Sequence, residues 1–133
     1  MPEVRRTIHF CYGHRIQGHG GGCRYLHGHN AKIEVVCRGP LDDLGMVVDF
    51  HEIRRIVEGW IDQNWDHRMI LQDGDPMIPI LKDQGEPVFV IDEVPTAENL
   101  AAYLFHIARE GGLPVTSVRF WETPSSIAVY DDA

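Results

Sequence analysis

The fold is decided by one short stretch, HGHNAKIEVVC, which spans residues 27–37. In its second part, residues 31–37, apolar side chains at every second position alternate with Lys32 and Glu34, which is the period of a strand with one buried face. Residues 4–10, VRRTIHF, also alternate loosely and are rich in β-forming residues. We therefore predict two strands, joined by a glycine-rich loop.

Two helices are predicted in the sequence that follows this pair of strands. Residues 49–64 carry apolar side chains at helical spacing, and Asp49 with Glu52 can form a capping pair at the start. Residues 97–110 repeat the pattern behind Thr96, a candidate N-cap, and two glycines supply the stop.

The remaining segments complete an α+β order. Residues 72–87 are rich in Gly and Pro, which break regular structure, and residues 87–91 read as a short strand. Residues 115–122 and 125–131 alternate as two further strands around Pro124. This order favours helices on one face of an antiparallel sheet, within a single domain over residues 1–133.

Composition limits the function. The net charge of −8 disfavours a nucleic acid as partner, because such binding depends on basic patches. No apolar run approaches the roughly 20 residues of a membrane span, and the N-terminus has no signal-peptide pattern. The odd set of Cys11, Cys23 and Cys37 argues against a disulfide framework. We therefore expect a cytoplasmic protein that binds a small molecule.

Three histidines form a candidate metal site. His27 and His29 lie two residues apart, so in an extended chain both imidazoles project to one side, and His14 at the end of the first strand can supply a third. Three nitrogen ligands leave one position of Zn²⁺ open, as in catalytic zinc sites. Iron and nickel also bind imidazole, and a chain with eight histidines can produce an H-x-H pair by chance.

Cys23 is a candidate base or nucleophile. It lies in the glycine-rich loop, four residues before His27 and next to Arg24, and positive charge nearby favours a thiolate. The alternative is a small, inert side chain, which is the usual state of a free cysteine. Cys11 and Cys37 fit strand packing, and we assign them no chemistry.

Asp66 and His67 form a candidate acid–base pair, because a neighbouring carboxylate orients and polarises an imidazole. As a dipeptide this signal is weak. Glu98 and Glu122, taken alone, fit surface carboxylates at the start of a helix and the end of a strand.

The ordered set of motifs resembles one family. The segments HFCYGHR, CRYLHGHN, GMVVDF, WDH, PTAEN and WETP are similar to those of the 6-pyruvoyltetrahydropterin synthase/6-carboxytetrahydropterin synthase family, over nearly the whole chain. The spacing C-x-x-x-H-G-H, from Cys23 to His29, is similar to the bacterial 6-carboxytetrahydropterin synthases of queuosine biosynthesis. In the animal pyruvoyl enzymes the cysteine lies further from the histidines.

The resemblance implies roles for individual residues. It implies that His14, His27 and His29 are zinc ligands, Cys23 the catalytic thiol, Asp66 and His67 the acid–base pair, Glu122 the carboxylate that anchors the pterin ring, and Thr96 and Glu98 a pocket segment contributed from another subunit. One departure is clear: small residues normally precede the first zinc histidine, whereas here Cys11, Tyr12 and Gly13 do. We expect Tyr12 to reshape the rim of the pocket.

The resemblance also implies a fold and a reaction. The fold is the tunnelling fold, a four-stranded antiparallel sheet with two helices on one face, whose subunits close into a barrel as trimers and stack as a homohexamer. The reaction is zinc-dependent conversion of 7,8-dihydroneopterin triphosphate to 6-carboxytetrahydropterin, with release of acetaldehyde and triphosphate. The alternatives are a pyruvoyl synthase that only eliminates triphosphate, and an inactive paralogue that binds zinc or a pterin.

Overall fold

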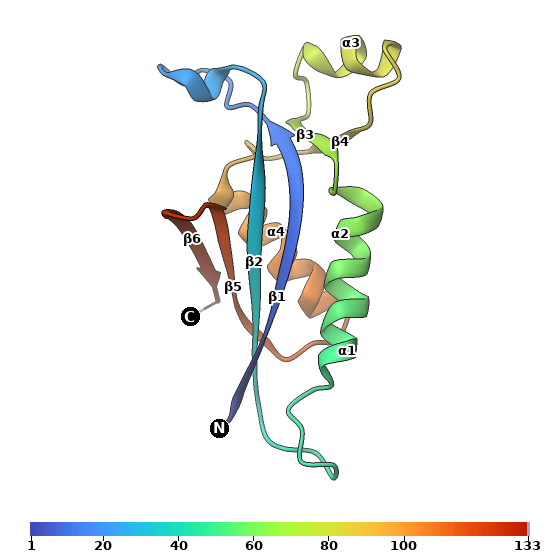
Figure 1. Ribbon diagram of the computed structural model, residues 1–133, viewed down its shortest axis with the longest axis vertical. Coiled ribbons are helices and arrows are strands. Elements are labelled where there is room, and N and C mark those ends of the chain that lie inside the picture. The colour runs from blue at the N-terminus through green and yellow to red at the C-terminus, as the bar shows by residue number, and fades with distance from the viewer. Residues whose placement is uncertain (133) are drawn as a thin grey trace.

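The computed structural model describes residues 1–132 and shows a curled sheet with helices packed on one face (Figure 1). The sheet has six strands in the order β4-β3-β1-β2-β5-β6. The strands are β1 (Glu3–His14), β2 (His27–Arg38), β3 (Arg68–Gln72), β4 (Val88–Ile91), β5 (Val115–Thr123) and β6 (Ser126–Asp131). The helices are η1 (Gly22–Arg24), α1 (Phe50–Ile53), η2 (Arg54–Glu58), α2 (Gly59–Asn64), α3 (Met77–Asp83) and α4 (Ala97–Glu110).

A long hairpin of β1 and β2 is the centre of the sheet. Its antiparallel register runs from Glu3 opposite Arg38 to His14 opposite His27. Both strands were predicted, but each is longer than expected, because pairing continues to the edge of the glycine-rich loop. The hairpin therefore carries its histidines within the ladder, on a backbone that is fixed by hydrogen bonds.

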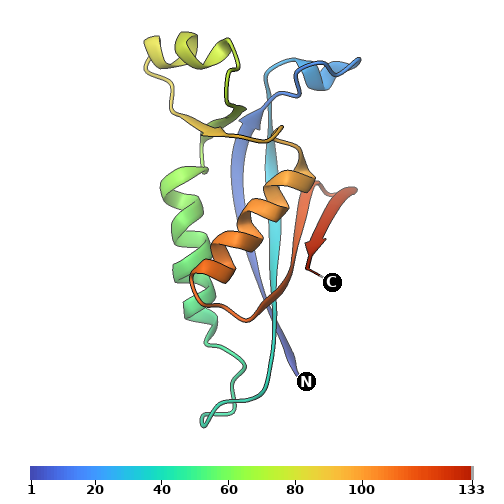
Figure 2. The same cartoon turned by 180° about the vertical axis from the view of Figure 1, so that it is seen from behind.

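Both predicted helices are confirmed. The first runs without interruption over residues 50–64 as α1, the π-helical η2 and α2, and the Asp49 carboxylate accepts the His51 N–H at 2.8 Å. The Glu52 carboxylate pairs with Arg55 rather than completing a reciprocal cap. In α4, the Thr96 hydroxyl accepts the Asn99 N–H at 3.2 Å. Figure 2 shows that both helices cover the same face of the sheet.

The four-stranded antiparallel description is incomplete. β1, β2, β5 and β6 are antiparallel neighbours as expected, but β3 and β4 add two strands parallel to β1, which makes the sheet mixed. β3 escapes pattern analysis because it is a short apolar run directly after a helix. α3 lies in the segment that was predicted to be irregular; it tolerates Pro79 because the first turn of a helix has backbone N–H groups without partners.

The core lies between the helices and the covered face of the sheet. Ile33 and Val35 from β2 pack there with Leu100 and Leu104 from α4, and all four are fully buried. Each such side chain contributes about 1.5–3 kcal/mol by leaving water. Within residues 1–132, no helix is both long enough and apolar enough to cross a membrane.

Candidate active site

The three predicted metal ligands meet at one end of the hairpin. His14 ends β1, His27 begins β2 opposite it, and His29 lies opposite Tyr12 in the same ladder. The ring centroids are 4.6 Å apart for His14 and His27, 5.0 Å for His27 and His29, and 5.1 Å for His14 and His29. The strands thus bring together imidazoles that the loop separates in sequence.

Backbone carbonyls fix the orientation of two of these imidazoles. The Nδ1 atom of His14 lies 2.7 Å from the carbonyl oxygen of Pro95, and the Nδ1 atom of His27 lies 2.7 Å from that of Tyr25. Because a carbonyl oxygen only accepts, each Nδ1 is the donor, and each neutral ring keeps its lone pair on Nε2. Metal-binding histidines are commonly held in this way.

Glu122, at the end of β5, joins the histidine cluster. Its Oε1 atom lies 2.8 Å from Nε2 of His29 and 3.1 Å from Nε2 of His14. Neither nitrogen makes a hydrogen bond of acceptable geometry within the described residues. Burial lowers the pKa of both histidines, and the opposing effects of the Glu122 charge and, for His14, of Pro95 do not reverse it.

This arrangement fits a bound cation. Neutral imidazoles present lone pairs toward a carboxylate, and such a set of acceptors is stabilised by a positive ion among them. The candidate ligand atoms of His14, His27, His29 and Glu122 all lie within 4.8 Å of one another. The chain therefore has a histidine–carboxylate cluster that could bind a metal ion.

Asp66 and His67 are held against β1 by a set of hydrogen bonds. The Asp66 Oδ1 atom accepts the Cys11 N–H at 3.1 Å, and the His67 N–H donates to the Cys11 carbonyl at 2.7 Å. The other Asp66 oxygen lies 3.0 Å from Nδ1 of His67. His67 has a φ of 59°, a left-handed conformation that costs energy for a residue with a Cβ. The neighbouring strand thus compensates a strained backbone at this pair.

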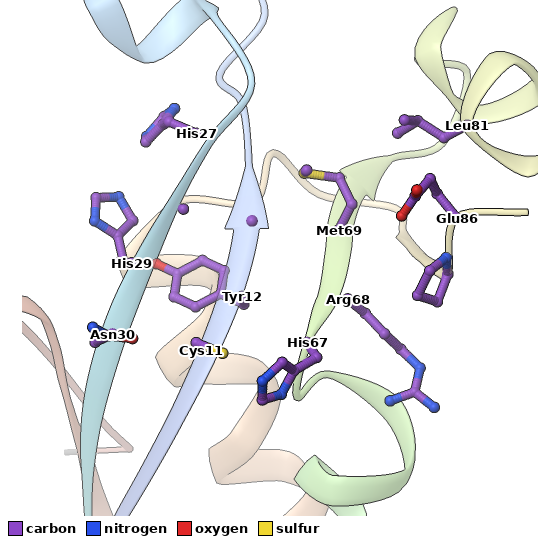
Figure 3. A pocket seen from close by; sticks show the side chains of 13 residues that line it. Cys11, Tyr12, His27, His29, Asn30, His67, Arg68, Met69, Leu81 and Glu86 are labelled. Carbon is purple, nitrogen blue, oxygen red and sulfur yellow. The ribbon is translucent and has the colours of Figure 1, made fainter. Parts of the chain in front are cut away.

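One cavity of about 650 Å³ lies between His67 and two of the three histidines (Figure 3). His67 lines one side of it, and His27 and His29 line the other. Cys11, Tyr12, Met69 and Glu86 also line this cavity. Since 78% of the His67 side chain is exposed, its imidazole is accessible to a molecule in the cavity. The structure therefore brings together residues that are about 40 positions apart in the sequence.

Cys23 lies apart from this cavity. It is half-buried in η1, in the loop at the same end of the sheet as the histidines, but it is not among the residues that line the cavity (Figure 1). Arg24 stacks over the Tyr25 ring and donates to the Gly20 carbonyl, so its contacts stay within the loop. A catalytic role for Cys23 stays a prediction.

Thr96 and Glu98 lie at the start of α4, and Glu98 lies close to Glu122. The Thr96 hydroxyl caps the helix, as predicted. Glu98 and Glu122 line a second, small cavity of about 80 Å³ together with residues of β6. Glu122 is thus the residue that connects the histidine cluster with the start of α4.

Sequence analysis missed two features of the cavity. Tyr12 lines the cavity, and it does so as a buried residue, with 3% of its surface exposed, that contacts the rings of His14 and His29. Cys11 was assigned to packing, yet its side chain lines the cavity and lies 3.9 Å from the Asp66 carboxylate. The strand period gave a signal for Tyr12, because it places residues 12 and 14 on one face.

Fold and site together define a class: an α+β protein with a histidine–carboxylate cluster on strand ends that could bind a metal ion, next to an Asp–His pair. The sequence profile of the 6-pyruvoyl tetrahydropterin synthase family matches residues 3–133. The chain belongs to this family.

Relatives in sequence point to one branch of the family. A 6-carboxy-5,6,7,8-tetrahydropterin synthase of Rickettsia bellii is 39% identical over 133 residues, with 94% of this chain and 96% of the relative covered. A probable enzyme of the same name from Halobacterium salinarum is 38% identical, with 92% and 82% covered.

Solved structures agree on the fold. The 6-pyruvoyl tetrahydropterin synthase of Caenorhabditis elegans superimposes with a TM-score of 0.74 at 27% identity, covering 100% of this chain and 98% of the other. An uncharacterized protein from Wolinella succinogenes gives a TM-score of 0.83 at 27% identity, with 99% and 98% covered.

Proposed function

We propose that this chain is a 6-carboxytetrahydropterin synthase, which converts 7,8-dihydroneopterin triphosphate and water to 6-carboxytetrahydropterin, acetaldehyde and triphosphate, a step of queuosine and other 7-deazaguanine biosynthesis. The observation that carries the proposal is the cavity that His27 and His29 of the histidine cluster share with His67 of the Asp66–His67 pair. The names of the similar proteins support the carboxy product.

The proposed metal is Zn²⁺, held by His14, His27 and His29. Three neutral nitrogens suit zinc with an open position, where it would act as a Lewis acid on substrate oxygens and stabilise developing negative charge. Nitrogen ligands also accept iron or nickel, so elemental analysis of the purified protein decides the metal.

The chain's own residues would move the protons. Asp66 holds Nδ1 of His67 at 3.0 Å, which leaves Nε2 to take up or give a proton at a substrate hydroxyl. Cys23, as a thiolate, would remove and return protons at the side-chain carbons. This role requires the η1 loop to reach the cavity.

Glu122 would orient the pterin ring. A carboxylate can accept two hydrogen bonds from the ring N–H and exocyclic amino group. Thr96 and Glu98 would extend the same binding surface toward a neighbouring subunit; the small cavity that Glu98 shares with Glu122 supports this.

We also propose a homohexamer made of two trimers, in which the sheets of three subunits close into a barrel. The edge strand β6 exposes Ile127 and Val129, at 48% and 55% of their surfaces, and an open strand edge is an aggregation hazard unless it is covered. The free cysteines fit a reducing, cytoplasmic setting. A monomer in light scattering at micromolar concentration would contradict the barrel.

The test of the reaction is an anaerobic incubation of zinc-loaded protein with 7,8-dihydroneopterin triphosphate, followed by mass spectrometry. We expect 6-carboxytetrahydropterin together with acetaldehyde. A pyruvoyl product would instead assign elimination of triphosphate alone, and unchanged substrate would favour a protein that only binds zinc or a pterin. The His67→Gln variant, which lacks the proton-transfer group, serves as the low-turnover control.

A further inference from the structure

Tyr12 is wedged between the metal cluster and the core. Its ring centroid lies 5.1 Å from that of His14, in an edge-on arrangement, and 5.7 Å from that of His29. On the core side it meets Phe120 edge-on at 5.7 Å. Only 3% of the residue is exposed, so the phenol cannot reach bulk water.

The phenolic hydroxyl has no hydrogen-bond partner within residues 1–132. A buried hydroxyl without a partner is unfavourable, and nearly all such groups in proteins find one. Nε2 of His14 and Nε2 of His29 are also buried without a partner. A cation on the two imidazoles would satisfy the nitrogens but not the hydroxyl, which needs an acceptor.

Glu122 is a candidate acceptor for this hydroxyl. Its Oε1 atom lies within 3.1 Å of Nε2 of His14 and of His29, and the Tyr12 ring contacts both of these imidazoles. The carboxylate and the phenol therefore lie against the same two residues. A carboxylate and a neutral hydroxyl form one of the stronger hydrogen bonds in proteins.

We propose that Tyr12 is a positioning residue that donates its phenolic hydrogen bond to the Glu122 carboxylate when the three imidazoles hold a cation. The bond turns the carboxylate away from the imidazole nitrogens and fixes its direction. The consequence for ligand binding rests on the proposed function, in which Glu122 binds the pterin ring. Tyr12 thereby affects pterin affinity through the Glu122 carboxylate.

The test is a double-mutant cycle with Tyr12→Phe, Glu122→Gln and the double variant. The first readout is the thermal unfolding midpoint, with and without zinc. Without metal, Tyr12→Phe should unfold at the same or a higher temperature, because it removes a hydroxyl that has no partner. With zinc, Tyr12→Phe should lower the midpoint when Glu122 is present and should lower it less in the Glu122→Gln background, because a neutral amide oxygen accepts a weaker hydrogen bond than a carboxylate does.

The second readout is equilibrium binding of neopterin, a fluorescent pterin, to the zinc-loaded variants. Tyr12→Phe should weaken binding by about five- to tenfold, the usual effect of losing one hydrogen bond to a charged group. The same substitution should have a smaller effect in the Glu122→Gln background. Tyr103→Phe is the matched control, since Tyr103 packs against Trp60 and Trp65 and does not line the cavity.

The outcomes separate this inference from the proposed function. Equal effects of Tyr12→Phe with Glu122 and with Glu122→Gln would overturn the inference, because the tyrosine would then act by packing alone or directly on the ligand. A lower unfolding midpoint of the metal-free variant would also overturn it. If the wild-type protein binds no neopterin, the proposed function fails, while the zinc-dependent coupling still decides whether Tyr12 positions Glu122.

Discussion

The Nδ1 atom of His14 lies 2.7 Å from the carbonyl oxygen of Pro95, 81 residues away in the chain. This contact joins the end of β1 to the segment that leads into α4. Leu100 and Leu104 of α4 are fully buried in the core, so the orientation of one candidate ligand depends on the packing of that helix. The geometry of the candidate metal site thus depends on how α4 packs against the sheet.

Replacing a candidate ligand should abolish metal binding. For His27→Ala, we expect zinc affinity to fall by more than the about 10–100-fold that losing a supporting hydrogen bond costs a metal site. Metal content after dialysis against a weak chelator, measured by plasma mass spectrometry, checks this. His106→Ala is the control, because that histidine is exposed on α4. Stoichiometric zinc in His27→Ala would refute the three-histidine site.

Mutation of Cys23 should lower turnover without affecting metal binding. Cys23→Ala should keep zinc, since Cys23 does not belong to the histidine–carboxylate cluster. Its turnover should fall by about 10²–10⁴-fold, the range for loss of a proton-transfer group. Metal analysis and a rate assay on the same preparation of the variant test both expectations. Normal turnover in this variant would remove Cys23 from the mechanism, in keeping with its position outside the cavity.

The Asp66–His67 pair should act on turnover rather than on binding. His67→Gln removes the proton-transfer group at the cavity, so we expect kcat to fall by about 10²-fold or more with little change in KM. Asp66→Asn should have a smaller effect, because the amide oxygen can still accept from the Cys11 N–H. Steady-state kinetics on both variants test this. A rise in KM alone would indicate a binding role for His67.

Sequence patterns predicted those structural features that depend on local periodicity. The hairpin strands and the shared face of His27 and His29 follow from a spacing of two residues, and the two helices follow from a spacing of about 3.6, with the Asp49 and Thr96 caps at their starts. Glu122 could be placed only by resemblance, because it reaches the cluster through the pairing of β5 with β2, which no local pattern encodes.

The parts that were missed depend on long-range contacts. β3 is stabilised by lying between β1 and β4. The cavity position of Cys11 depends on where Asp66 docks, 55 residues away. The role of Tyr12 is set by what surrounds its hydroxyl, which a strand pattern does not report.

The last prediction concerns a buried ion pair at the start of α3. Arg15, just after β1, contacts the Asp75 carboxylate through two nitrogens, and Asp75 also accepts the Met77 N–H at 2.9 Å. Burial alone would raise the pKa of Asp75, but Arg15 and the Met77 N–H outweigh burial and hold this pKa below its ordinary value of 3.8. The ion pair therefore stabilises the fold fully above that value, and its contribution is lost as the pH falls through the lowered pKa.

Asp75→Asn should lower the free energy of unfolding at neutral pH by about 1–3 kcal/mol, because it leaves a partly buried guanidinium without its charged partner. The difference from wild type should shrink below about pH 4, where the wild-type carboxylate takes up a proton in the unfolded chain and then in the folded one. Urea unfolding at pH 7 and at several acidic values measures both effects. Asp73→Asn is the matched control, since Asp73 is exposed two residues earlier. A difference that stays constant down to pH 2 would show that Asp75 stabilises the fold through its shape and not through its charge.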